Sequence, residues 1–118
     1  AKLQPSAIGY VNAHGTGTPL GDQAESQAIY RLFGGSVPVS SIKGAIGHCI
    51  AAAGAVEAVA CIGALKEGLL LGTTGLVEQD ENCPVLVLKE TVTQQVSNIL
   101  TNSFGFGGQN CSLLFGKY

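Results

Sequence analysis

Charged side chains are scarce in this sequence and make up 12% of its 118 residues. Six of them are Lys or Arg, scattered along the chain, and the formal net charge is −2. Proteins that bind nucleic acid or an anionic membrane carry a stripe or patch of basic side chains. The sequence has no such stripe, so we expect small molecules or other proteins as partners, with no nucleic acid and no membrane among them.

The sequence also lacks any C-x-x-C pair. Its four cysteines stand far apart, at Cys49, Cys61, Cys83 and Cys111. Zinc sites and the disulfide frameworks of secreted proteins are recognised by characteristic cysteine spacings. We therefore expect no metal site, no disulfide framework and no secretory leader, and a cytoplasmic location.

No membrane span is predicted. The apolar run CIAAAGAVEAVACIGAL at residues 49–65 is interrupted by Glu57 and is shorter than the roughly 20 residues that a span requires. Its many Ala and Gly residues make a poor lipid-facing surface, so we expect a helix buried inside a soluble protein. Apolar residues make up 46% of the chain, which is enough for the core of one folded domain.

Apolar spacing, together with Gly and Pro boundaries, predicts the secondary structure. Strands are expected at residues 7–13, 37–41, 85–88, 96–101 and 112–115, and helices at residues 22–33 and 49–65. A turn is expected at residues 44–47, irregular chain at 69–84 and a glycine-rich connection at 104–108. Strands that alternate with helices and then end in a hairpin predict a layered α/β fold.

The helix at residues 22–33 is predicted to be amphipathic. Acidic residues occupy its first turn, and two glycines after residue 33 end it. Its apolar face is expected to consist of Ala24, Ala28, Ile29 and Leu32.

Both histidines lie beside glycines at the ends of predicted elements. His14 follows the first strand, in AHGTGTPLGD, and His48 precedes the apolar helix, in SIKGAIGHCIAAAG. Side chains at the carboxyl ends of strands in α/β sheets converge on the ligand crevice, which places His14 and Lys43 for chemistry. The alternative to a functional role is that one histidine is an ordinary turn residue, the other is a polar residue that happens to lie at a helix end, and Lys43 is a solvated surface lysine.

His48 is expected to be neutral, because the positive end of the helix dipole disfavours a second positive charge. A neutral imidazole can donate a hydrogen bond to an oxygen that gains charge, as in an enolate or oxyanion. The GFGG segment at residues 105–108 can add free backbone N–H groups, since glycines allow positive φ. Taken alone, this segment is a hairpin turn, and Phe104 and Phe106 favour core positions.

Glu57 lies inside the apolar helix, where an unpaired carboxylate would be costly. We therefore expect a cationic or hydrogen-bonded partner, and Lys43 is the nearest candidate along the chain. Cys49 directly follows His48, but adjacent residues on a helix point about 100° apart. We interpret Cys49 as a small core residue, because free cysteine packs like a modest hydrophobe.

Three motifs together resemble the C-terminal half of the β-ketoacyl-acyl carrier protein synthases, the condensing enzymes of fatty acid and polyketide synthesis. They are AHGTGTPLGD, SSIKGAIGHCIAAAGAVEA and NSFGFGGQN, in this order, and the resemblance covers residues 9–115. It implies a thiolase-like fold of α-β-α-β-α layers, with the apolar helix in the central layer. It also implies decarboxylative Claisen condensation, in which a cysteine-bound acyl group reacts with malonyl-acyl carrier protein.

The resemblance implies roles for four catalytic residues. His14 and His48 are similar to the two histidines that polarise the malonyl thioester and hold the enolate. Lys43 is similar to the active-site lysine, and Glu57 to the glutamate that pairs with it.

The resemblance also implies substrate-binding residues. Thr16 and Thr18 match the threonines that hydrogen-bond the pantetheine arm. Phe106, between Gly105 and Gly107, matches the gating phenylalanine whose backbone N–H joins the oxyanion hole. No cofactor is implied, because the phosphopantetheine arm arrives on the acyl carrier protein.

The family's nucleophilic cysteine lies in an N-terminal half that this sequence lacks. Residues 1–118 are therefore interpreted as a C-terminal ketosynthase domain, incomplete at its N-terminal end and active only together with that half. Such a piece would expose sheet edges and the apolar helix. The expected partners are the N-terminal half, the acyl carrier protein and a ketosynthase subunit in a homodimer or heterodimer.

An alternative interpretation is a non-catalytic subunit similar to the chain-length factor, which pairs with a ketosynthase and shapes the product tunnel. Such partners need not keep the two histidines or the lysine. All three are present here, at His14, Lys43 and His48, which favours the catalytic interpretation.

Overall fold

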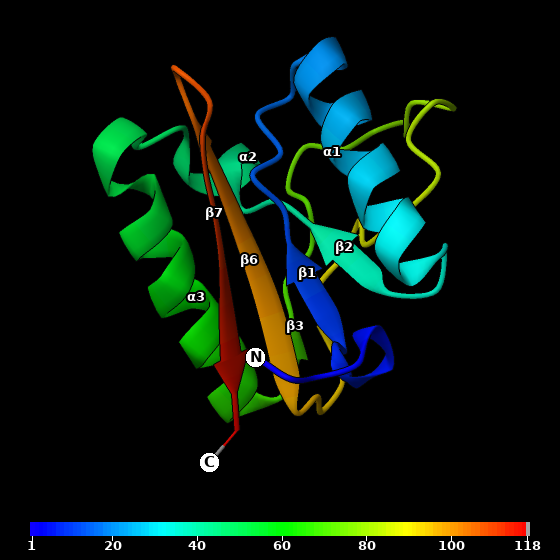
Figure 1. Cartoon of the computed structure of the whole chain (residues 1–118), viewed down its shortest axis with the longest axis vertical. Coiled ribbons are helices and arrows are strands. Elements are labelled where there is room, and N and C mark those ends of the chain that lie inside the picture. The colour runs from blue at the N-terminus through cyan, green and yellow to red at the C-terminus, as the bar shows by residue number, and fades with distance from the viewer. Residues whose placement is uncertain (118) are drawn as a thin grey trace.

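The computed structural model describes residues 1–117 and contains a five-stranded sheet in the order β4-β2-β1-β6-β7 (Figure 1). The strands are β1 (Tyr10–Asn12), β2 (Pro38–Ser40), β4 (Leu86–Val87), β6 (Asn98–Gly105) and β7 (Gln109–Gly116). β1 runs parallel to β2 and β6, β2 runs parallel to β4, and β7 runs antiparallel to β6. The predicted layered α/β fold and its final hairpin are confirmed, with longer hairpin strands than expected.

Two helices cover opposite faces of this sheet (Figure 1). They are α1 (Pro19–Phe33) and α3 (Ala53–Glu67). Successive side chains of a strand point to opposite faces. Tyr10 accordingly joins a core cluster with Cys61 and Leu65 of α3, whereas Val11 joins a second cluster with Ile29 of α1. The central strand β1 therefore anchors the core on both sides.

Helix α1 presents a different face to the sheet from the one predicted. It begins at Pro19, earlier than expected, because a proline fits the first turn, where its missing N–H is not required. Of the expected apolar face, Ile29 is buried, but three residues are exposed: Ala24, Ala28 and Leu32. The polar residue Glu25 is buried instead, because it forms hydrogen bonds at the end of β1.

The segment before α3 also differs from the prediction. The expected turn is a short helix, α2 (Lys43–Ile46), and a 3-10 turn, η2 (Ile50–Ala52), follows it. Helix α3 starts at Ala53 and not at residue 49, because Ile50 has a φ of +50°, which a right-handed helix cannot contain. It ends at Glu67, two residues beyond the expected end, and the N–H of Gly68 donates to the carbonyl of Ala64.

Short elements replace two other predicted segments. The first strand is shorter than expected, because residues 5–7 form a 3-10 helix, η1 (Pro5–Ala7). The stretch predicted as irregular begins with β3 (Leu69–Leu70), which pairs with β5 (Val92–Thr93) in a separate antiparallel sheet. The remainder of that stretch is irregular, as predicted, and is fixed to α1 by a 2.9 Å hydrogen bond from Gln23 to Asp80.

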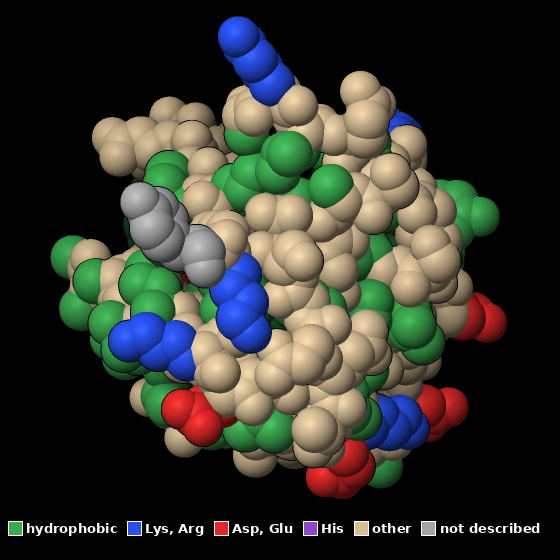
Figure 2. All heavy atoms as spheres, turned by 90° about the horizontal axis from the view of Figure 1, so that it is seen from below, with side chains coloured by type: hydrophobic (Ala, Val, Ile, Leu, Met, Phe, Trp, Pro, Cys, Tyr) green, Lys and Arg blue, Asp and Glu red, His purple; other side chains and the backbone are tan. Residues whose placement is uncertain are grey.

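Helix α3 buries one face and exposes the other. Glu57 and Cys61 are buried, whereas Val59 is 71% exposed and Val56 and Ile62 also reach the surface. In Figure 2, hydrophobic side chains gather on the side where Figure 1 places α3. The prediction of a helix buried on every side is wrong for this chain, and the expected exposure of an apolar helix is confirmed. Within residues 1–117, no helix has both the length and the apolar character that crossing a membrane requires.

Candidate active site

The parallel strands β1 and β2 end at the same edge of the sheet, where Asn12 lies opposite Ser40. His14 follows β1, and Lys43 follows β2. The positive charge of Lys43 contributes to the electrostatic environment of His14. The structure thus brings these two predicted site residues together at the carboxyl ends of the strands.

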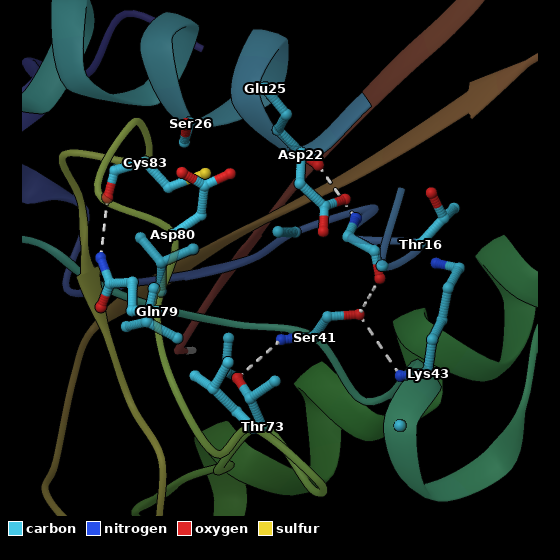
Figure 3. Close-up of a pocket in the computed structure, with 18 of the residues that line it drawn as sticks. Thr16, Asp22, Glu25, Ser26, Ser41, Lys43, Thr73, Gln79, Asp80 and Cys83 are labelled. Atoms are coloured by element: carbon cyan, nitrogen blue, oxygen red, sulfur yellow. Dashed lines mark hydrogen bonds between the residues drawn. The ribbon is translucent and has the colours of Figure 1, made fainter. Parts of the chain in front are cut away.

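A cleft of about 630 Å³ opens at this edge (Figure 3). Ser41 and Lys43 lie on one side of it, and Gln79 and Asp80, from the segment after β3, lie on the other. The Ser41 hydroxyl donates to the carbonyl of Gly15 at 2.8 Å and accepts from the main-chain N–H of Lys43 at 3.3 Å. Ser41 therefore holds the loops after β1 and β2 against each other.

The turn that carries His14 is fixed by Glu25 of α1. One carboxylate oxygen accepts the main-chain N–H of His14, and the other accepts that of Gly15, each at 2.9 Å. Asn102 of β6 donates to the same carboxylate at 3.0 Å, and Ser112 of β7 donates to the Asn102 side chain at 2.7 Å. The sheet and α1 thus hold the His14 turn through one hydrogen-bonded network.

Sequence reasoning missed Glu25, because it counted this residue among the acidic residues early in an amphipathic helix. The helical periodicity nevertheless indicates that Glu25 is buried. Residues four positions apart lie on the same helix face, so a buried Ile29 places Glu25 on the buried face as well. Its partners, however, are backbone groups, which no residue pattern identifies.

The rings of His14 and His48 pack edge to face. Their centroids are 5.4 Å apart, and the ring planes are inclined by 83°. The ring of Phe104 of β6 also packs edge to face against His14, with the centroids 5.4 Å apart. The two predicted catalytic histidines are therefore adjacent, although 34 positions separate 14 from 48 in the sequence.

His48 does not occupy the helix N-terminus that the sequence predicted, because α3 begins only at Ala53. Its side chain is oriented by a different group. The main-chain N–H of Ile50 donates to Nδ1 of His48 at 3.1 Å. A neutral imidazole that accepts at Nδ1 carries its proton on Nε2, so His48 is a hydrogen-bond donor at Nε2.

His14 is disfavoured from taking a second proton. Burial lowers the pKa of His14 below its usual value of 6.5, and the nearby positive charge of Lys43 lowers it further. Its Nδ1 atom is buried and has no hydrogen-bond partner within residues 1–117. Burial and Lys43 therefore favour the uncharged form of the His14 ring.

Lys43 and Glu57 form the ion pair that the sequence predicted. The side chain of Lys43 is 6% exposed and that of Glu57 is fully buried. Ser103 of β6 lies 3.5 Å from the second carboxylate oxygen of Glu57. The pair joins the start of α2 to α3 across the buried side of the site.

The predicted substrate-binding residues lie in two loops. Thr16 and Thr18 line the cleft, and their hydroxyl groups are 2.9 Å apart. Phe106 is fully exposed at the tip of the β6–β7 hairpin, so the sequence interpretation of a core position is wrong. Gly107 has a φ of +80°, as expected of a glycine turn, whereas Gly105 is the last residue of β6.

The cysteines fall into different environments. Cys49 is partly exposed in the loop before η2, so its interpretation as a core residue is wrong, and the late start of α3 explains the difference. Cys61 is buried on α3, and burial raises the pKa of its thiol to about 11. Cys111 is exposed on β7. No group of three His, Cys, Asp or Glu side chains within residues 1–117 is arranged to hold a metal ion.

The sequence matches a known protein family. Residues 1–76 match the family model described as beta-ketoacyl synthase, C-terminal domain. The chain belongs to the β-ketoacyl synthase family. It is 41% identical over 120 residues to 3-oxoacyl-[acyl-carrier-protein] synthase 2 of Mycobacterium tuberculosis, in an alignment that covers 100% of this chain and 29% of that protein.

Solved ketosynthase structures share the fold. The ishigamide ketosynthase/chain length factor superimposes with a TM-score of 0.95 at 34% identity, over 98% of this chain and 29% of that one. A second similar structure is that of a type II polyketide synthase acyl-carrier protein in complex with its ketosynthase bound to the hexaketide. Its TM-score is 0.93 at 28% identity, and the match covers 99% of this chain and 30% of that one. The predicted thiolase-like fold is confirmed, and this β-ketoacyl synthase chain spans less than a third of those proteins.

Proposed function

We propose that this chain is the C-terminal catalytic part of a β-ketoacyl synthase, which condenses an acyl thioester with malonyl-acyl carrier protein. The observation that carries the proposal is the edge-to-face pair of His14 and His48 beside the cleft that Lys43 lines. Two neutral imidazoles at one crevice can both donate hydrogen bonds to the same developing charge.

The geometry supports a specific sequence of electron movements. In decarboxylation, the bond between the malonyl carboxylate and its central carbon breaks, CO₂ leaves, and the electron pair moves onto the thioester oxygen. The Nε2 proton of His48 and the uncharged ring of His14 stabilise this enolate oxygen. The enolate carbon then attacks the acyl thioester, a C–C bond forms, and the enzyme's thiolate leaves.

The thiolate nucleophile would come from outside this chain. A nucleophilic cysteine needs a lowered pKa and an electropositive surrounding, whereas burial raises that of Cys61. Cys83 lines the cleft but is buried, Cys49 is partly exposed before η2, and Cys111 is exposed on β7. We therefore assign the nucleophile to the N-terminal half of the ketosynthase, with which this chain would form the complete site.

The substrate would arrive on a carrier protein. Thr16 and Thr18 present hydroxyl groups to the cleft, where they can hydrogen-bond the amides of a phosphopantetheine arm. Phe106 is fully exposed at the hairpin tip, and we assign it the role of a gate. The solved complex of a ketosynthase with its acyl-carrier protein supports such a partner.

A second candidate is a chain-length-factor-like subunit, because a ketosynthase/chain length factor structure is among the neighbours. The retained His14, Lys43 and His48 favour the catalytic role. The residue at the nucleophile position of the N-terminal half separates the two functions, since a cysteine there supports catalysis and another residue supports the non-catalytic subunit.

The experiment uses the ketosynthase assembled from this chain and its N-terminal half. His48→Ala is expected to lower malonyl decarboxylation by about 10²–10³, the usual effect of losing one preorganised donor. Acyl loading of the nucleophilic cysteine should remain measurable by mass spectrometry. Lys66→Ala, at an exposed lysine of α3, is the control. Normal decarboxylation by the His48 variant would contradict the proposal.

A further inference from the structure

Three consecutive residues near the end of β6 contact three different parts of the candidate site. Asn102 donates to Glu25, the carboxylate that holds the His14 turn, at 3.0 Å. Phe104 packs its ring against the ring of His14. Ser103 lies between them, and its side chain points to the other face of the sheet, toward α3. Ser103 is therefore the residue of this run that faces the buried ion pair.

The two carboxylate oxygens of Glu57 have different partners. Oε1 pairs with Lys43, whereas Oε2 accepts a hydrogen bond from the Ser103 hydroxyl at 3.5 Å. Within residues 1–117, Ser103 is the one hydrogen-bond donor to Oε2, and the Glu57 side chain is fully buried. A buried carboxylate oxygen without a hydrogen bond is costly. The Ser103 hydroxyl thus satisfies the oxygen that Lys43 does not bind.

Helix α3 makes room for Ser103 at Gly54. Gly54 lies three residues before Glu57, so the two residues share one helix face. A Cβ at position 54 would lie 3.2 Å from Oγ of Ser103, closer than most side-chain contacts in proteins. A larger residue at this position would therefore displace the hydroxyl from the carboxylate beside it.

We propose that Ser103 is a positioning residue for the ion pair of Lys43 and Glu57. Its hydroxyl binds Oε2, so that Oε1 stays directed at Lys43, and Gly54 leaves the space that this contact needs. Because Lys43 lines the cleft, the serine acts on the site through the ion pair. The inference rests on the proposed function for its effect on turnover, whereas the contact itself is independent of that function.

Paired glycine substitutions in the assembled ketosynthase test the contact by thermal melts. Gly54→Ala should lower the melting temperature, because the new methyl group displaces the Ser103 hydroxyl. In a Ser103→Ala background the nearest atom is the Cβ of residue 103, 3.9 Å away, so Gly54→Ala should no longer destabilise. Gly63→Ala is the matched control on the same helix. Its Cβ meets no atom within 4 Å, so it should raise the melting temperature in both backgrounds.

A second comparison separates the ion pair from general packing. Ser103→Ala should lower the melting temperature of the unsubstituted protein. In the variant that combines Lys43→Met with Glu57→Leu, no buried charge remains, so Ser103→Ala should leave the melting temperature unchanged. A serine that only packs against α3 would cause the same loss in both proteins.

Malonyl decarboxylation measures the effect on the site. We expect Ser103→Ala to lower kcat about tenfold, as loss of one hydrogen bond to a charged group would. KM should stay unchanged, because Thr16 and Thr18 lie in a different loop. Gly63→Ala should retain the unsubstituted kcat.

The outcomes distinguish the two proposals. An unsubstituted enzyme that does not decarboxylate malonyl-acyl carrier protein, but in which Gly54→Ala destabilises only when Ser103 is present, would refute the proposed function and support the contact. Equal melting shifts for Gly54→Ala in both backgrounds would overturn the positioning role. So would an equal loss from Ser103→Ala with and without the charges, or an unchanged kcat of Ser103→Ala in an active enzyme.

Discussion

The main-chain N–H of His14 donates a 2.9 Å hydrogen bond to the carboxylate of Glu25. Glu25 is a buried residue of α1, and His14 lies in the loop that leads from β1 to the same helix. A helix on one face of the sheet thereby fixes the position of a histidine at its edge. The same carboxylate also binds Gly15, so the whole turn depends on one buried charge.

Glu25→Gln should destabilise the protein, because an amide offers only one acceptor oxygen to the donors of the His14 turn. Each hydrogen bond to a charged group contributes about 1.5–3 kcal/mol. Urea unfolding should show a loss of this order, and the amides of His14 and Gly15 should exchange faster. Glu81→Gln, at an exposed acidic residue, is the control and should leave both unchanged. Unaltered exchange in Glu25→Gln would show that the carboxylate does not hold the turn.

Glu57→Ala should cost about 3–5 kcal/mol, because it leaves the buried charge of Lys43 without a partner. Lys43→Met combined with Glu57→Leu removes both charges, so stability should return while condensing activity stays low. Thermal melts and a decarboxylation assay on the single and double variants test this. Near-native melting of Glu57→Ala would mean that the pair contributes nothing to stability.

Two glycine substitutions should change the free energy of unfolding in opposite directions. A Cβ on Gly44 would collide with the carbonyl oxygen of Thr74, so Gly44→Ala has to displace the cleft wall and should cost about 1–3 kcal/mol. A Cβ on Gly63 of α3 meets no other atom, and Gly63→Ala should stabilise by about 0.5–1 kcal/mol. Denaturant unfolding of the 118-residue chain measures both. Equal effects would contradict the close approach at Gly44.

The His14 ring should titrate below pH 6.5, because burial and Lys43 lower its pKa. As the pH falls through the window between 6.5 and this lowered pKa, the unfolded chain binds more protons than the folded one. The contribution of His14 to stability is therefore complete above pH 6.5 and decreases as the pH falls through that window. Histidine NMR titration measures the pKa directly, and a value at or above 6.5 would refute the direction.

The isolated chain should not form an acyl-enzyme, because covalent catalysis needs a thiolate and an oxyanion hole in one site. Incubation with an acyl thioester, followed by mass spectrometry, should leave all four cysteines unmodified. Iodoacetamide at pH 8 should label exposed Cys111 and leave Cys61 unlabelled, because burial raises the pKa of that thiol to about 11. An acyl group on Cys49 would contradict the assignment of the nucleophile to the N-terminal half.

The sequence by itself determined the layered fold and the identity of the charged partners. Short apolar runs with Pro and Gly boundaries located β1 and β2. A carboxylate within an apolar helix required a cationic or hydrogen-bonded partner, and Lys43 was the nearest candidate for Glu57. Both follow from local rules, since apolar periodicity and the cost of an unpaired buried charge depend little on the rest of the fold.

Tertiary structure decided which face of α1 is buried and where α3 begins. Glu25 faces inward because main-chain N–H groups of another loop need an acceptor, and backbone groups leave no pattern in the sequence. Ile50 interrupts the apolar run because its N–H binds His48, a contact that outweighs the conformational preference of isoleucine. In both cases a hydrogen bond of the folded backbone prevailed over local side-chain propensity, because a residue pattern does not show which main-chain group a side chain will meet.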